Sequence, residues 1–172
     1  MSGYIRTSRE CFVSQLNPGL LQVIREYFQT HQLGDLDSGT LLCCETISEK
    51  RDSGRLGGFL ATLLESDRDT TIHFVMLLTA EWLIWVRNGD RSGTMVTGCK
   101  LKLIQVRAFV SRQTKEMELE VSGFIADTKE YVKGILVLGP DLAAQIFCEA
   151  VMQAVRKANP PAKSTRPKWL GG

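Results

Sequence analysis

The sequence has little net charge and few of the side chains that hold metal ions. Its 172 residues carry a formal net charge of only +2 at pH 7, because 21 Lys and Arg residues are nearly balanced by 19 Asp and Glu residues. A charge this small does not attract nucleic acid through the overall field, so an electrostatic argument must rest on local clusters. Two histidines in all exclude a metal site with three histidine ligands. We therefore expect no nucleic-acid partner, no metal and no other cofactor.

Disulfide and zinc patterns are also missing. The number of cysteines is odd and no C-x-x-C motif occurs, which argues against both a disulfide framework and a zinc knuckle. The five cysteines are Cys11, Cys43, Cys44, Cys99 and Cys148. Cys43 and Cys44 are adjacent, so on a strand they would point to opposite faces. This cysteine usage is typical of a reducing compartment and predicts a cytoplasmic location.

Long apolar runs, targeting signals and catalytic motifs are absent as well. The longest apolar block, 72–86, is interrupted by polar residues and falls short of the roughly eighteen apolar residues that span a bilayer. Residues 1–15 show no signal-peptide pattern, and no glycine-rich phosphate motif occurs. No serine or cysteine is spaced locally near His31 or His73, so no catalytic triad is predicted. We expect a soluble protein that is not an enzyme.

Two segments have the periodicity of amphipathic helices. The first begins at Asn17, a capping residue, with Pro18 at the first helical position, and ends at Gly34. The second begins at Asp141 and ends before Pro160. Its apolar positions follow i, i+3, i+4, i+7 spacing: Ala143, Ile146, Phe147, Ala150, Val151, Ala154 and Val155. A charge placed at Ile146 or Phe147 is expected to unfold the domain.

From Thr40 to Gly139 the pattern changes to strands. Runs of β-branched and aromatic residues alternate with short polar clusters, which predicts an antiparallel meander without intervening helices. The seven predicted strands cover 40–47, 56–65, 70–79, 81–87, 93–109, 115–125 and 130–138. A change of parity near Leu103 and Ile104 predicts a bulge. Residues 1–16 have weak periodicity and predict an irregular lead-in that can include a short helical turn.

One strand has a clear inner and outer face. Met117, Leu119 and Val121 are expected in the core, and they alternate with three glutamates expected on the solvated face. Those glutamates are Glu116, Glu118 and Glu120.

Seven strands followed by one amphipathic helix is the order of the pleckstrin-homology superfold. The hairpin over 71–90 resembles the strand–turn–strand of bacterial PH-like and GRAM-type domains. The predicted fold is therefore mainly β with capping helices: a PH-like seven-stranded antiparallel barrel plus a C-terminal helix, with an extra N-terminal helix. We divide the chain into an N-terminal extension with the amphipathic helix (1–35), a PH-like domain (36–158) and a disordered basic tail (159–172). The added helix departs from the family pattern, as does Phe147, where many eukaryotic PH domains have a tryptophan.

The resemblance implies a scaffold that binds phosphoinositides, peptides or other proteins, or assembles with copies of itself. The fold alone does not choose among these. In phosphoinositide-binding members, the loop after the first strand carries basic residues that bind phosphate. Lys50, Arg51 and Arg55 occupy this place here, although Glu49 and Asp52 reduce the local charge. A solvated hairpin tip is the alternative interpretation of this loop.

Two tryptophans indicate a second candidate surface. Trp82 and Trp85 are three residues apart, so on a strand they face opposite sides. One is expected in the core, and the other is expected to be exposed and to mark an interface.

Our leading prediction is a non-catalytic PH-like binding or assembly module. It would act through contact with a protein partner or through self-association as a homo-oligomer. One alternative is a peripheral membrane or phosphate-binding module, in which the Lys50–Arg55 loop and the basic tail contact an anionic membrane surface. Another is a small-ligand-binding protein with an internal pocket.

Overall fold

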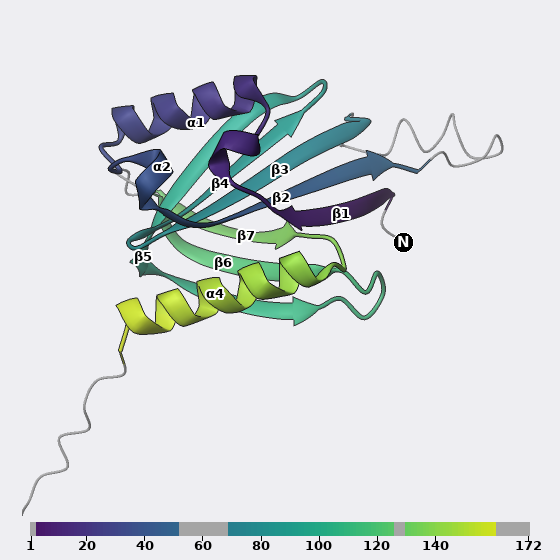
Figure 1. Cartoon of the computed structure of the whole chain (residues 1–172). Coiled ribbons are helices and arrows are strands. Elements are labelled where there is room, and N and C mark those ends of the chain that lie inside the picture. The colour runs from purple at the N-terminus through teal and green to yellow at the C-terminus, as the bar shows by residue number, and fades with distance from the viewer. Residues whose placement is uncertain (1–2, 52–68, 126–129, 161–172) are drawn as a thin grey trace, which may run out of the picture.

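The computed structural model describes residues 3–51, 69–125 and 130–160 (Figure 1). Within them the strands are β1 (Tyr4–Glu10), β2 (Thr40–Lys50), β3 (Thr71–Thr79), β4 (Trp82–Gly89), β5 (Gly93–Val110), β6 (Met117–Ile125) and β7 (Tyr131–Val137). The helices are α1 (Pro18–Thr30), α2 (Leu36–Gly39) and α4 (Leu142–Ala158), with a 3-10 turn at Val13–Gln15. The strands form one antiparallel sheet in the order β1 to β7, curled into a half-barrel. The predicted fold class is confirmed: mainly β, with a C-terminal helix and an added N-terminal helix.

The first strand was not expected. β1 pairs antiparallel with β2, from Tyr4 opposite Lys50 to Glu10 opposite Cys44. The prediction of an irregular lead-in is therefore wrong for these residues, although the 3-10 turn after them fits it. Only Ser8 of β1 is buried, so this edge strand lacks the apolar alternation that makes a strand visible in a sequence. The strand predicted at 56–65 lies outside the described residues.

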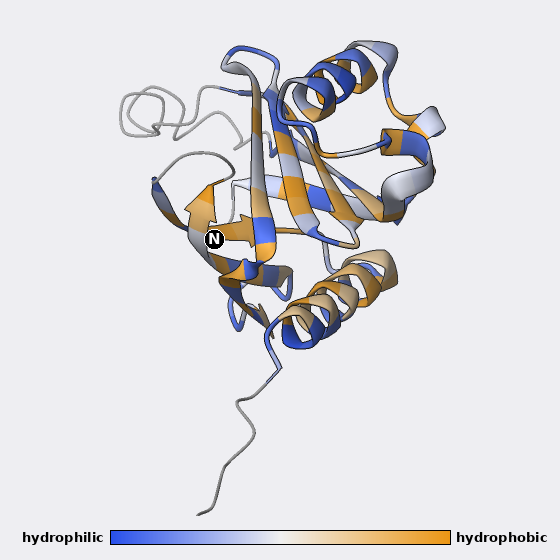
Figure 2. Ribbon diagram, turned by 90° about the vertical axis from the view of Figure 1, so that its left-hand side faces the viewer, coloured by the Kyte–Doolittle hydropathy of each residue, from blue (hydrophilic) through white to orange (hydrophobic). Residues whose placement is uncertain are grey.

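The helix α1 lies on the outer face of the sheet (Figures 1 and 2). Asn17 caps it as predicted, because its side chain accepts a 2.9 Å hydrogen bond from the Gly19 amide. The helix buries Leu20, Ile24 and Phe28. Together with the sheet residues beneath them they form the outer layer, which includes Cys43, Val75, Leu77, Trp82, Ile84 and Val86.

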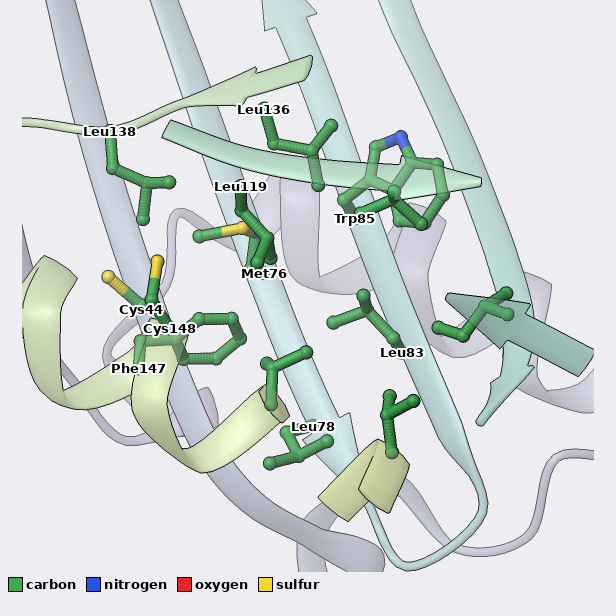
Figure 3. Packing of buried hydrophobic residues seen from close by; sticks show 14 of the residues in the cluster. Cys44, Met76, Leu78, Leu83, Trp85, Leu119, Leu136, Leu138, Phe147 and Cys148 are labelled. Atoms are coloured by element: carbon green, nitrogen blue, oxygen red, sulfur yellow. The ribbon is translucent and has the colours of Figure 1, made fainter. Parts of the chain in front are cut away.

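The helix α4 packs against the opposite, inner face (Figure 3). Phe147 is fully buried there, among residues of the inner layer that include Cys44, Met76, Leu83, Trp85 and Leu119. The buried stripe of α4 is rotated from the predicted one: Ile146 is 43% exposed, whereas Ala144 and Cys148 are buried. The small side chains of Ala144 and Cys148 complete the buried stripe, and apolar spacing alone did not single them out. Because Ile146 faces solvent, a charge there does not enter the core, contrary to the expectation that it unfolds the domain.

The strand β5 changes partners along its length. Residues Gly93 to Lys100 pair with β4, and residues Ile104 to Val110 pair with β6, while Cys99 pairs with both β4 and Ile125 of β6. The register shifts between Cys99 and Ile104, which confirms the predicted irregularity near Leu103 and Ile104. Beyond Lys100, no strand among the described residues pairs with the other edge of β5.

Polar contacts connect β1 to the far end of the sheet. Arg6 binds both carboxylate oxygens of Glu116, at 3.0 and 2.9 Å. The Ser8 amide donates to Asp141 Oδ2 at 2.7 Å, and the Ser8 hydroxyl accepts from the Gly139 amide at 2.8 Å. Glu116 was expected on a solvated face but is buried, because it precedes β6 and turns toward Arg6.

Candidate binding groove between β5 and α4

A groove of about 490 Å³ lies between β5 and the C-terminal turns of α4. Its wall on β5 consists of the five consecutive residues Lys102 to Val106. The other residues that line it are Phe124 of β6 and Met152, Val155, Arg156 and Asn159 at the end of α4. The groove therefore lies where β5 has left β4.

Two local features hold this part of β5 in place. The Asn159 side chain donates to the carbonyl oxygen of Leu101 at 2.9 Å and to that of Val155 at 3.1 Å, so the end of α4 is tied to β5. On the other side, Gly123 of β6 comes so close that a Cβ there would lie 2.4 Å from the Leu103 carbonyl oxygen. Only glycine permits this approach.

The groove combines apolar side chains with positive charge. Leu103 is 48% exposed and Phe124 is 44% exposed, so both present apolar surface to the groove. Lys102 and Arg156 are exposed at its rim, and none of the ten lining residues is acidic. The chemistry suits an occupant with apolar side chains and carboxylates.

The backbone of β5 adds a second kind of recognition. In an antiparallel strand, successive residues direct their N–H and C=O groups to alternate edges. Ile104 to Val106 pair only with β6, and Lys102 and Leu103 lie in the register shift without a strand partner among the described residues. Alternate residues of this stretch therefore direct backbone groups toward the other edge. An extended peptide can bind such an edge through main-chain hydrogen bonds.

The structure describes two of the three basic residues predicted to bind phosphate. Lys50 is the last residue of β2, and Arg51 follows it with an exposed side chain and an amide that donates to Gly3. Arg55 lies outside the described residues, as does most of the basic tail. The phosphate site therefore stays a prediction.

The two tryptophans lie on opposite faces of β4, as expected, but both are buried. Trp82 is 7% exposed in the outer layer, and Trp85 is 6% exposed in the inner layer. The expectation that one ring is exposed is wrong, because α1 covers one face of β4 and the inner layer covers the other.

A charged cluster lies on the outer face of β1, β2 and β3. The buried Glu45 carboxylate accepts two hydrogen bonds from Arg9, at 2.8 and 2.6 Å, and lies 3.5 Å from His73 Nδ1. Hydrogen-bonded partners therefore account for this buried carboxylate. In the described part of the chain, no group of three or more side chains is arranged to hold a metal ion. None of the described helices is long and apolar enough to cross a membrane.

Sequence reasoning did not identify the groove, although it located one cause of it. The parity change near Leu103 and Ile104 marks the point where β5 bends, but the sequence does not say that β4 ends before it. Comparisons with protein-family models, curated proteins and solved structures give no match.

Proposed function

We propose that this protein is a non-catalytic binding module that holds an extended peptide segment of a partner protein in the groove between β5 and α4. The observation that carries the proposal is the edge of β5 from Lys102 to Val106, which lines the groove and has no strand beside it among the described residues. A segment added there would continue the sheet.

The side chains of the groove define the peptide. Apolar residues at alternate positions of the segment would contact Leu103, Phe124 and Met152. Acidic residues near its ends would meet Lys102 and Arg156, because charge-assisted hydrogen bonds to carboxylates are stronger than neutral ones. Five consecutive backbone units along one wall favour an extended chain over a compact small molecule.

The first experiment selects binders from a displayed library of random peptides long enough to cover Lys102 to Val106. We expect enriched peptides to alternate apolar residues and to carry Asp or Glu. Their affinity, measured by fluorescence anisotropy, should fall about tenfold in Lys102→Glu and again in Arg156→Glu. Arg112→Glu, an exposed change in the β5–β6 turn, is the matched control and should leave the affinity unchanged. No enrichment, or affinities indifferent to both groove variants, would refute the proposal.

A second experiment tests strand addition itself. The best peptide is prepared in two forms, with N-methyl groups on its odd or on its even residues. Only one of these sets faces β5, so one form should lose binding and the other should keep it. Equal affinity of both forms would show that the peptide does not pair with the backbone of β5.

A further inference from the structure

The structure brings together two cysteines that are far apart in the sequence. Cys11 Sγ and Cys43 Sγ lie 3.3 Å apart. Cys11 follows the end of β1 and continues its register, so it stands opposite Cys43 of β2, and its amide donates to the Cys43 carbonyl oxygen at 3.1 Å. Directly opposite residues in an antiparallel pair have Cα atoms about 4.5–5.5 Å apart. Disulfides span the same separation, so a bond can form without moving the strands.

Both cysteines are buried, with Cys11 8% and Cys43 3% exposed, and both line a surface cavity of about 300 Å³. The other lining residues include the apolar side chains of Phe12 and Leu41 and the acidic residues Glu10 and Asp37. Cys44, the next residue of β2, points to the opposite face and lies in the inner layer. The chain therefore supplies an adjacent thiol on the closed side of the same strand.

The two thiols differ in acidity. The hydrogen bond from the Cys43 thiol lowers the pKa of Cys11, and the Arg9 guanidinium acts in the same direction, while burial and the Glu45 carboxylate oppose them. The same hydrogen bond, followed by burial, raises the pKa of Cys43, so Cys43 keeps its proton. Burial raises the pKa of Cys44 to about 12, and those of Cys99 and Cys148 to about 11. Cys11 is thus the thiol best suited to react as a thiolate.

We propose that Cys11 and Cys43 form a thiol–disulfide exchange site that reacts with low-molecular-weight disulfides. The Cys11 thiol first gives its proton to water, and its thiolate attacks one sulfur of the reagent R–S–S–R. The reagent's S–S bond breaks, R–S⁻ leaves and takes up a proton, and Cys11–S–S–R remains. In this mixed disulfide Cys11 no longer carries a thiolate, so the largest cause of the raised pKa of Cys43 is gone. Cys43 then loses its proton to solvent and attacks Cys11 Sγ, which expels a second R–S⁻. The protein loses two electrons and two protons overall, and R–S–S–R becomes two R–SH.

Glutathione disulfide is the probe for the full chain in its native state. After exposure, free thiols are alkylated, the protein is denatured and digested, and its peptides are assigned by mass spectrometry. We expect a Cys11–Cys43 disulfide, with Cys44, Cys99 and Cys148 alkylated only after denaturation. The half-time of the Cys11–Cys43 reaction should be at least about tenfold shorter than that of any other cysteine. A fully reduced Cys11, or a disulfide between any other two cysteines, would overturn the proposal.

Single variants separate the two roles. Cys43→Ser should stop at the mixed disulfide on Cys11, and Cys11→Ser should form neither product. Cys44→Ser, the matched control from the adjacent position, should behave like the parent. A mixed disulfide that accumulates at Cys43 in the Cys11→Ser variant at the parental rate would reverse the assigned roles and contradict the proposal. Since the mapping on the parent chain needs no substitution, a variant that fails to fold does not remove the test.

Discussion

At the scale of single residues, Asp69 shows how a buried charge is stabilised. Its carboxylate accepts hydrogen bonds from the Arg91 and Ser92 amides, both at 2.8 Å, from the Ser92 hydroxyl at 2.6 Å, and from Arg87 at 2.8 Å. Burial acts to raise the pKa of Asp69, but these hydrogen bonds outweigh it and hold the pKa well below its usual range. One side chain thus holds the turn between β4 and β5.

Replacing Asp69 with Asn should lower the free energy of unfolding by about 3 kcal/mol near neutral pH, because Arg87 loses its buried partner. The folded pKa is depressed, so the carboxylate stabilises the fold above its unfolded pKa of about 3.9, and this contribution disappears as the pH falls through the folded value. The difference between parent and variant should therefore shrink toward about pH 2. Urea unfolding across this range measures it.

The control is Asp37→Asn, which removes an exposed ion pair with Arg25. This substitution should lower the free energy of unfolding by less than about 1 kcal/mol. A loss at Asp69 that is the same at every pH would show that shape rather than charge is responsible.

The sequence predicted residue environments best where polarity and spacing agree. It placed Met117, Leu119 and Val121 inside correctly, because they alternate with polar residues along one strand. It failed for Glu116, whose burial depends on Arg6, a partner 110 positions away. Such long-range pairings arise from the curl of the sheet and leave no local pattern.

At the scale of elements, α4 offers neighbouring positions with opposite roles. Phe147 is fully buried in the inner layer, whereas Ile146 faces outward. Phe147→Asp should lower the free energy of unfolding by at least about 4 kcal/mol and unfold the domain, because it creates a cavity and buries an unpaired charge. Ile146→Asp should stay within about 1 kcal/mol of the parent. Thermal unfolding followed by circular dichroism distinguishes them, and equal melting of the two variants would mean that α4 is rotated differently.

The close approach of β6 to β5 can be tested with two glycines. Gly123→Ala should lower the free energy of unfolding by about 2 kcal/mol. The new Cβ would lie 2.4 Å from the Leu103 carbonyl oxygen and 2.8 Å from Ile104 Cα, and these backbone atoms cannot rotate away as a side chain could. Gly134→Ala in the neighbouring strand β7 is the control, because nothing lies within 4 Å of its Cβ position. It should be neutral or slightly stabilising. Urea midpoints measure both, and a harmless Gly123→Ala would place β5 farther from β6.

The helices and strands differ in how well their sequence patterns predict them. α1 has a cap, a proline and a periodic stripe, and its predicted start agrees with the structure. β1 has none of these signals, because an edge strand with polar residues on both faces resembles a loop in sequence. Missing β1 also concealed the pairing of Cys11 with Cys43, since their proximity exists only once β1 lies against β2.

At the scale of the whole molecule, the sheet separates two apolar layers and belongs to both. Alternate residues of β2, β3 and β4 contribute to each layer, as Cys43 and Cys44 do. The groove lies at the end of this arrangement, where β5 continues beyond β4. The groove exists because β4 stops pairing with β5. This is a property of the assembled sheet, and a local sequence pattern does not show it.

The two buried tryptophans make each layer separately observable. With Trp169, which lies outside the described residues, replaced by Phe, the variants Trp82→Phe and Trp85→Phe would each retain one indole, in the inner and in the outer layer respectively. In each variant, we expect the urea unfolding transition followed by fluorescence to have the same midpoint as the transition followed by circular dichroism. The reason is that adjacent residues of the same strands support both layers, so the layers should unfold together. Separate midpoints would instead reveal an intermediate in which one layer has melted. Because side chains alternate between the two faces of β4, two tryptophans three residues apart report on the two layers separately.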